Sequence, residues 1–375
     1  MKKNSSNLAP RLQSLDTLRG CDMFFIMGGG AFFASICAFF PDSSVASAIA
    51  NQFKHVPWNG FAFEDMIFPL FLFIAGISFP YSLDNSKRKN LSSTKIHLNV
   101  IRRGIVLILL GIVYNGFFHL DFENMRCASV LGRIGLAWMF SALIFLHTNT
   151  KQRGFVAALI LIGYWLLITF VPAPDGDGNP FSKEGSLVGY IDRLFMPGVL
   201  LYRGVHDPEG LLSAVPAIAT AMFGMLTGEF VKSKKFNISE SKKVLYLIVC
   251  GVALIIIGKL WNIVFPINKN LWSSSFVCFV GGISLIAFSV FYYLIDVKGL
   301  KGWTLAFRVI GMNSITIYLA QSMINFRYTA NYFFGGFIAL FENETMQNLL
   351  NSSIYIITCW LFLYFLYKKN IFLKV

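Results

Sequence analysis

The feature that most constrains this chain is a succession of long apolar segments. A helix needs roughly 20 mostly apolar residues to cross about 30 Å of hydrocarbon, and about ten such windows follow one another along the 375 residues. We expect membrane helices over 18–40, 61–83, 99–118, 127–147, 154–172, 209–231, 243–265, 271–295, 304–326 and 347–367. Only 14% of the residues are charged, against about 25% in soluble domains. The predicted fold is an all-α, polytopic membrane helix bundle that forms one domain, 1–375.

The basic residues are concentrated on one side of this predicted membrane. If the N-terminus is cytoplasmic, 23 of the 32 Lys and Arg fall in or beside cytoplasmic segments. Cytoplasmic loops carry such an excess in membrane proteins, so the bias favours an even number of spans and two cytoplasmic termini. The net charge of +13 does not indicate a nucleic-acid partner, because no recognised module or compact basic domain accompanies it.

The segments outside the main apolar pattern carry few structural signals. The longest loop, 173–208, is predicted to be extracytoplasmic, is rich in turn residues over 174–180 and could cap a cavity. The first apolar segment contains Arg19 and Asp22 and has no cleavage pattern, so we expect it to be a retained span. The six cysteines have neither a CxxC pair nor metal-ligand spacing. They are interpreted as small core residues, and no metal site is expected.

Ionisable residues at membrane depth indicate a site or a structural pairing. Asp16, Arg19 and Asp22 are spaced i, i+3, i+6, which places them on one stripe of the first predicted helix. A charge at the centre of a membrane helix costs about 2.5–3.5 kcal/mol on insertion scales, so it usually faces a partner or a cavity. Two interpretations remain open: an ion ladder that holds the start of the helix, and an Arg19 that meets an anionic ligand.

The densest group of polar side chains lies between the first two predicted spans. His55, Trp58 and Asn59 are followed closely by Glu64 and Asp65. A lone histidine in a loop is usually solvated. His55, however, is close in sequence to two carboxylates, and an unperturbed imidazole pKa near 6.5 suits proton transfer at neutral pH. His55 is therefore the candidate general base, with Asp65 as the group that orients it.

Further polar and aromatic residues are predicted at the same membrane boundary. They flank the sixth, seventh and eighth predicted spans. With the first loop they form a candidate sugar-binding mouth of Trp58, Asn59, Asp207, Glu209, Asn268, Asn270 and Trp272. Aromatic faces and carboxylate or amide groups suit a carbohydrate. The alternative is equally compatible with the pattern: interfacial Trp residues as membrane anchors and Asn and Asp as helix caps.

Several stretches, in order along nearly the whole chain, carry a family resemblance. They are 11–20 (RLQSLDTLRG), 53–60 (FKHVPWNG), 65–69 (DMIFP), 73–76 (FIAG), 189–194 (GYIDRL), 207–210 (DPEG), 268–272 (NKNLW), 296–299 (DVKG), 311–314 (GMNS) and 367–372 (YKKNIF). Together they resemble the heparan-alpha-glucosaminide N-acetyltransferase family. The resemblance implies an enzyme that moves acetyl from cytosolic acetyl-CoA to a glucosamine-type amine on the opposite side of the membrane.

The resemblance also implies roles for particular residues. The active-site histidine of the family falls on His55, which would deprotonate the amine or accept the acetyl group itself. The phosphates of CoA would meet some of the cytoplasmic arginines, for which the candidates are Arg19, Arg102, Arg103 and Arg308. One departure is Gly30, which stands where the family has an asparagine.

A second function stays open. The run 20–30 (GCDMFFIMGGG) also resembles a bacterial branch of the family sometimes labelled as an N-acetylglucosamine transporter of the NagX type. The alternative to the enzyme is thus a carrier for an amino sugar or its N-acetyl form. For either function we expect a multi-pass protein of the bacterial inner membrane, in contact with the lipid bilayer, and a homodimer is left open.

Overall fold

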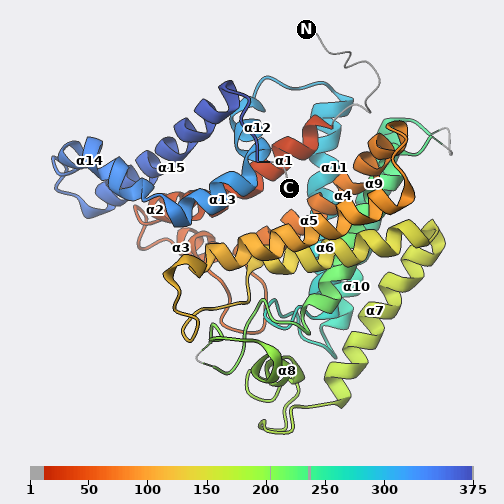
Figure 1. The fold of residues 1–375 in the computed structure, drawn as a ribbon. Helices are drawn as coiled ribbons and strands as arrows, with labels where there is room; N and C mark the ends of the chain where they lie inside the picture. Colours follow the sequence, from red (N-terminus) through yellow and green to blue (C-terminus); the bar gives the residue numbers. More distant parts are fainter. Residues whose placement is uncertain (1–11, 203, 235–237, 374–375) are drawn as a thin grey trace.

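The structure is a computed structural model, which describes residues 12–202, 204–234 and 238–373. These residues form helices and connecting loops, and no strand occurs among them. Figure 1 shows the helices as a bundle with α14 (Phe326–Ile338) and α15 (Glu344–Lys368) at one edge. Of the basic residues counted above, Lys2, Lys3, Arg11, Arg203, Lys235 and Lys374 lie outside the described residues.

Nine helical segments in the described part are long and apolar enough to cross a membrane, the first of them with a kink at Gly28. The first, Gln13–Cys37, joins α1 (Gln13–Phe24), a π-helical turn and α2 (Gly30–Cys37). The others are Phe63–Arg88 with α4 (Ile67–Arg88), α5 (Ser93–Tyr114), α6 (Val130–His147), α7 (Thr150–Phe170), α9 (Ala214–Lys232), α10 (Glu240–Trp261), Ser274–Val297 with α11 (Ser274–Tyr292), and α15. The predicted polytopic helical fold is confirmed.

The ninth predicted span, 304–326, is not one continuous helix. It is divided into α12 (Leu305–Met312) and α13 (Ser314–Met323), because Asn313 between them has non-helical backbone angles (φ −122°, ψ 25°). The approach of α12 to α1 is close: a Cβ on Gly311 would lie 1.9 Å from the carbonyl oxygen of Asp16. Glycine therefore lets the two backbones touch. Three further helices, α3 (Ser44–Gln52), α8 (Leu187–Phe195) and α14, were not predicted.

Contacts between the helix ends show that the spans alternate in direction. At one end of the bundle, Lys232 pairs with Asp84 at 3.1 Å and the Gln13 N–H lies 3.2 Å from Asp296. At the other end, the loops that follow α3, α5, α7 and α10 meet. Ala38, at the end of the first span, and Asn348, near the start of α15, line the same groove, so the last helix ends on the side where the first begins.

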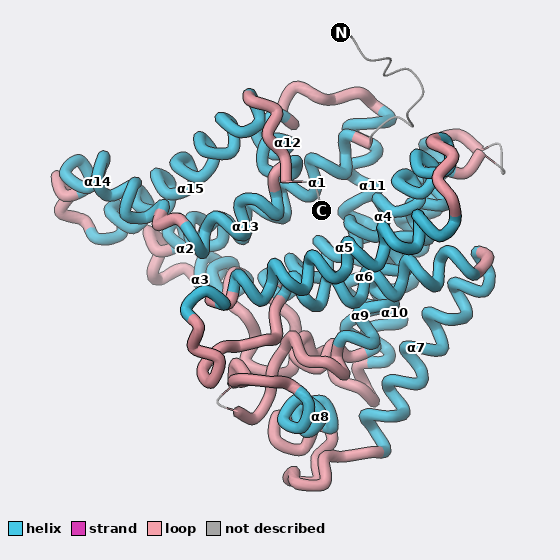
Figure 2. Tube along the Cα trace, viewed as in Figure 1, coloured by secondary structure: helices cyan, strands magenta, loops and turns pink. Residues whose placement is uncertain are grey.

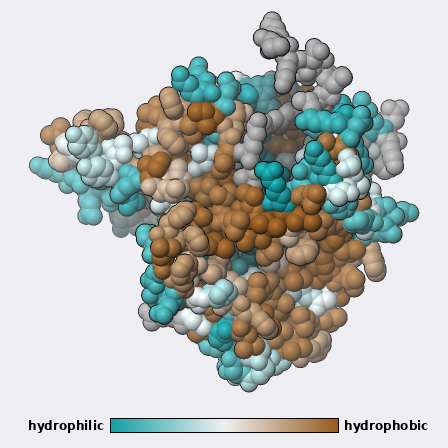
Figure 3. All heavy atoms as spheres, viewed as in Figure 1, coloured by the Kyte–Doolittle hydropathy of each residue, from teal (hydrophilic) through white to brown (hydrophobic). Residues whose placement is uncertain are grey.

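The helices pack closely in the core and expose apolar side chains on the surface, as expected for a protein in lipid. Helix α4 lies in the middle of the bundle and packs tightly on α9, where a Cβ on Gly224 would lie 2.1 Å from the carbonyl oxygen of Phe73. Figure 3 shows a hydrophobic band across the middle of the face that it draws. Exposed apolar side chains of α5 include Leu98, Ile105 and Leu109. Figure 2 shows the longest loops gathered at one end, around α8 (Leu187–Phe195). This is the end at which His55 lies.

Candidate active site

His55 lies in the loop between α3 and the short 3-10 turn Phe63–Met66, which leads into α4. Its Nδ1 is 2.8 Å from Oδ1 of Asp65, a carboxylate that is only 1% exposed. Asp65 also accepts the N–H of Ala62 at 3.1 Å, so the turn holds the carboxylate against its own loop. With the Nδ1 proton directed at Asp65, the Nε2 lone pair of His55 is available as a base.

Lys269 completes this group, and sequence reasoning did not select it. Its Nζ lies 3.1 Å from Nδ1 and 3.4 Å from Nε2 of His55, and 3.5 Å from Asp65. Burial lowers the pKa of Lys269, an effect that the charges of Asp65 and Glu209 oppose. The lysine comes from the loop between α10 and α11, which is tied to the His55 loop because Gly60 N–H donates to the Ile267 carbonyl at 2.8 Å.

These residues lie at one end of a cavity of about 210 Å³. His55, Lys269, Glu64 and Glu209 supply its charged or ionisable lining. Its apolar walls come from α1 and the π turn after it, the start of α4, α6 and α13. They include Met23, Ile26, Ile67, Phe68, Phe71, Leu131, Ile134, Ile315 and Tyr318. The cavity therefore extends from the polar loops into the helix bundle. A thioester or another small acyl group would find an apolar lining beside a base.

Gly30 faces the same region. A Cβ built on Gly30 would lie 3.5 Å from Oε2 of Glu64, at ordinary van der Waals distance. A side chain at this position would thus be directed toward a carboxylate that lines the cavity. Glycine leaves that space to Glu64, and the amide of the family asparagine has no counterpart here.

The structure places the predicted sugar-binding residues in different surroundings, and several of them are buried away from the cavity. Glu209 lines the cavity, whereas Trp58 is half-buried in the loop region, where its Nε1 donates to the Phe181 carbonyl at 2.7 Å. Asn59 accepts from Asn268 at 2.9 Å, and this bond joins the two loops. Three of the predicted residues, Asn268, Trp272 and Asp207, are fully buried. Trp272 donates to Thr220 inside the bundle, and Asn270 is also buried.

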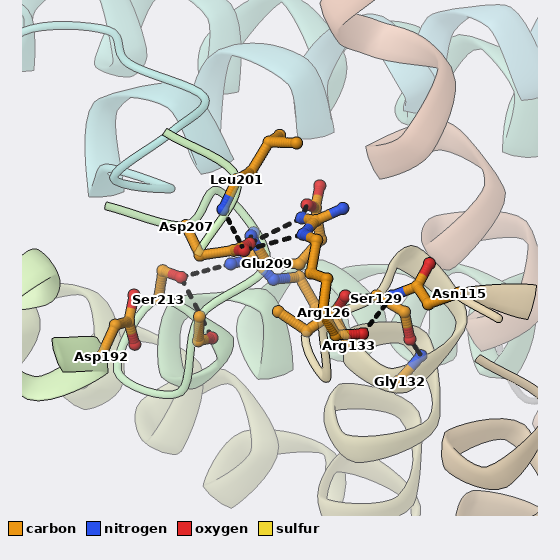
Figure 4. A network of polar contacts seen from close by, with 12 residues as sticks. Asn115, Arg126, Ser129, Gly132, Arg133, Asp192, Leu201, Asp207, Glu209 and Ser213 are labelled. Carbon is orange, nitrogen blue, oxygen red and sulfur yellow. Dashed lines mark hydrogen bonds and ion pairs between the residues drawn. The ribbon is translucent and has the colours of Figure 1, made fainter. Parts of the chain in front are cut away.

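Arg126 fixes Glu209 at the cavity (Figure 4). Its Nε and Nη2 donate to the two oxygens of Asp207 at 2.8 and 2.6 Å, and Nη2 also pairs with Glu209. Burial by itself raises the pKa of Asp207, but the hydrogen bonds and charge of Arg126 outweigh it and hold that pKa below its ordinary value. The arginine therefore keeps Asp207 ionised and holds Glu209 in an ion pair at the cavity.

Two other titratable groups near the mouth do not line the cavity. Burial lowers the pKa of the His206 imidazole to about 4, so it is neutral at physiological pH. Asp192 on α8 is fully buried, and its Oδ1 accepts the Leu211 N–H at 2.8 Å. Burial raises the pKa of Asp192 to about 7, although the Leu211 hydrogen bond and the charge of Arg133 act in the opposite direction.

We expect Asp192→Asn to weaken the dependence of thermal stability on pH. The pKa of an aspartate carboxyl is about 3.9 in the unfolded chain, and the pKa of Asp192 is about 7 in the folded protein. Between these two pH values the folded state holds a proton that the unfolded state has lost. The contribution of Asp192 to stability is thus complete below about pH 4 and declines as the pH rises to about 7. The variant, whose amide oxygen still accepts the Leu211 N–H, should melt higher than wild type at about pH 8.

The measurement is the melting temperature of the purified protein in detergent from about pH 5 to about pH 8. Asp175→Asn is the matched control, because this aspartate lies in the same long loop and its side chain is half exposed. If wild type and Asp192→Asn gave parallel curves, the buried carboxyl would not be the source of the pH dependence.

The four predicted CoA-binding arginines lie in different surroundings. Arg102 and Arg103 line a second cavity of about 330 Å³ toward the opposite end of the bundle, with Ser82, Ser86, Asn99 and Trp138. Arg19 donates to Ser78 at 3.2 Å and lies 3.8 Å from Asp16. Arg308 lies beside the side chain of Gln13. Of the four, Arg102 and Arg103 line the same cavity.

The two cavities share no lining residue. Trp138 and Ile134 line one cavity each and are four residues apart on α6, which is about one helical turn. Trp138 donates to the Ala75 carbonyl at 3.2 Å, and the guanidinium of Arg103 lies 4.3 Å from its ring centroid. The Trp138 ring thus lines the arginine cavity about one turn of α6 from the wall of the His55 cavity.

The fold and the site together define a polytopic membrane protein with a His, Asp and Lys group at the end of an intramembrane cavity. Residues 11–119, which include His55 and Asp65, match a family described as a domain of unknown function, DUF5009. The chain is 28% identical over 430 residues to human heparan-alpha-glucosaminide N-acetyltransferase, covering 99% of this chain and 61% of the human protein. The mouse protein of the same name is 26% identical over 434 residues, with 100% and 61% covered.

The chain is thus related to heparan-alpha-glucosaminide N-acetyltransferases along nearly its whole length. This relationship confirms the resemblance that its sequence motifs carry. The chain spans about three fifths of the length of these relatives.

Proposed function

We propose that this protein is a membrane acetyltransferase that moves acetyl from acetyl-CoA to the amine of a glucosamine-type sugar. The observation that carries the proposal is the position of the His55 and Asp65 pair, with Lys269, at the end of a cavity that reaches between the membrane helices. The relationship to acetyltransferases over nearly the whole chain supports the same reaction. The proposed location is the bacterial inner membrane.

The chemistry follows from the geometry of this pair. The amine nitrogen of the sugar attacks the thioester carbonyl, and Nε2 of His55 takes the proton that the amine loses. Asp65, 2.8 Å from Nδ1, stabilises the imidazolium that forms. The tetrahedral intermediate then expels the CoA thiolate, which receives the proton from His55, so the products are an N-acetyl sugar and free CoA. The same Nε2 is the atom that would carry the acetyl group in a two-step path.

Lys269 and the two carboxylates have complementary roles in this proposal. The Lys269 ammonium, 3.4 Å from Nε2 of His55, stabilises the oxyanion of the intermediate. Glu64 and Glu209, which line the same cavity, attract the positively charged amino sugar before it loses its proton. This arrangement supplies electrostatic stabilisation without the asparagine that Gly30 replaces.

Acetyl-CoA is proposed to reach the site from the end of the bundle at which Arg102 and Arg103 lie. Their cavity offers two guanidinium groups and the polar side chains of Ser82, Ser86 and Asn99 to the phosphates of the nucleotide. The acetyl group then has to pass from this cavity, which the Trp138 ring lines, to the His55 cavity. A displacement of this ring during the catalytic cycle joins the two cavities.

Arg102→Gln and Arg103→Gln are expected to raise KM for acetyl-CoA about tenfold or more, since a charge-assisted hydrogen bond is worth about 1.5–3 kcal/mol. The value of kcat should change less. Initial rates in detergent, from labelled acetyl-CoA and glucosamine, give both constants, and release of one CoA thiol per acetylated amine tests the reaction. Lys151→Gln, a basic residue that does not line this cavity, is the control. An unchanged KM in both arginine variants would contradict the proposed nucleotide site.

A carrier for an amino sugar is the second candidate, favoured by one observation. Asp22 is 3% exposed within the first span, and one of its carboxylate oxygens has no hydrogen-bond partner among the described residues. Buried carboxylates of this kind serve as proton-coupling groups in transporters. Uptake of unmodified glucosamine into liposomes without acetyl-CoA would support the carrier, and uptake only as the N-acetyl product supports the enzyme.

A further inference from the structure

A second polar groove lies at the edge of the bundle, apart from the His55 cavity. It has a volume of about 540 Å³ and is lined by α2 with the π turn before it, by α14 and by α15. Figure 1 shows these helices side by side at the margin of the molecule. The groove is formed by the end of the first span and the start of the last, so it is on the side of the membrane where the His55 loop lies.

The polar lining of this groove comes from a stripe on α15. Asn348, Asn351, Ser352 and Tyr355 all line it and are spaced i, i+3, i+4, i+7, which places them on one face of the helix. They lie within a segment that is long and apolar enough to cross a membrane. Amide groups at such a depth are costly unless a polar partner reaches them.

A single cation faces this stripe. Arg327, on α14, lines the groove together with Asn331, and the lining contains no aspartate or glutamate. Among the described residues, the side chains of Arg327, Asn331, Asn348 and Asn351 have no hydrogen-bond partner. The opposite wall consists largely of small residues of the first span, such as Ala31 and Ala34. The groove therefore combines a positive charge and free amides with room for a ligand.

The surroundings of the groove are apolar. Helix α14 exposes Tyr332, Phe333 and Leu340, which are 73%, 71% and 77% exposed. Aromatic residues of this kind are enriched at the boundary between lipid tails and headgroups. A ligand that fits both the polar groove and its apolar surroundings has an anionic, hydroxyl-bearing head and an apolar tail.

We propose that this groove binds the phosphodiester headgroup of an anionic glycerophospholipid such as phosphatidylglycerol. The phosphate pairs with Arg327, because a guanidinium matches two phosphate oxygens at once. The hydroxyls of the headgroup bond with the amides of Asn348 and Asn351, and the acyl chains lie along α14. The site is independent of acetyl transfer, since none of its residues lines the His55 cavity.

The test uses the full-length protein in detergent, titrated with phosphatidylglycerol or phosphatidylcholine and examined by native mass spectrometry. Wild type should retain one phosphatidylglycerol in preference to phosphatidylcholine, and Arg327→Gln should weaken that retention about tenfold or more. Lys259→Gln is the matched control: it removes an exposed positive charge from the same end of the bundle, and it should retain the lipid as wild type does.

Asn351→Leu provides a second variant, because leucine is well tolerated in a membrane helix. It should weaken phosphatidylglycerol retention severalfold without loss of the folded protein, which circular dichroism reports. Equal retention by wild type, Arg327→Gln and Asn351→Leu would overturn the site. Displacement of the lipid by millimolar glycerol phosphate would overturn the lipid assignment in favour of a soluble phosphate ligand.

Discussion

Alanine in place of His55 is expected to lower the rate of acetyl transfer to glucosamine by about 10²–10⁴-fold, the usual contribution of a general base. The loss should appear mainly in kcat, because the apolar cavity and the arginine cavity that hold acetyl-CoA are unchanged. The measurement is the initial rate with labelled acetyl-CoA. Asp65→Asn should lose less, since the amide still accepts a hydrogen bond from Nδ1 but does not stabilise the imidazolium.

His119→Ala is the matched control for this prediction. His119 is also exposed, and its loop follows α5 on the same side of the bundle, but it does not line the cavity. Its loss should leave the rate within about twofold of wild type, well below the effect of a general base. If His55→Ala retained full activity while binding acetyl-CoA normally, His55 would not be the base and the proposed chemistry would fail.

Arg126→Met is expected to cause the largest loss of stability, about 3–5 kcal/mol, which is typical when one partner of a buried ion pair is removed. Arg126 is the partner of both Asp207, which is fully buried, and Glu209. Its loss leaves two carboxylates close together without a cation. Unfolding in mixed micelles, followed by circular dichroism, gives the free energy of unfolding.

The control for Arg126→Met is Arg88→Met. Arg88 pairs with Asp84 one helical turn away, and its side chain is half exposed. An exposed pair of this type contributes about 0.3–0.5 kcal/mol. A variant of Arg126 that lost no more stability than the Arg88 variant would show that the Arg126 network is not a structural support of the cavity.

Hydropathy predicted most of the fold because the length of a membrane helix is set by the thickness of the bilayer. The exception is the segment 304–326, where mean hydropathy does not register a change of backbone angle at Asn313. Helix α14 was missed for a related reason. Its 13 residues are too few to cross the membrane, and its aromatic side chains resemble those of the neighbouring spans.

The core of the candidate site was predictable where its members are close in sequence. His55 and Asp65 are ten residues apart, and the turn between them brings the side chains together. Lys269 is 214 residues from His55, and in the sequence it is one more loop cation. Conversely, Trp272 and Asn268 look like exposed boundary residues, whereas the helix packing buries them completely. Sequence position does not tell which polar groups at a membrane boundary turn inward.

We propose that the acetyl group crosses the membrane from acetyl-CoA on one side to the amino sugar on the other. Sealed liposomes that contain glucosamine inside and labelled acetyl-CoA only outside test it directly, with the cytoplasmic face of the protein outward. Labelled N-acetylglucosamine should accumulate inside the wild-type liposomes while free CoA appears outside, and His55→Ala liposomes should form neither. Product that forms only when both substrates are on the same side of the membrane would contradict transmembrane acetylation.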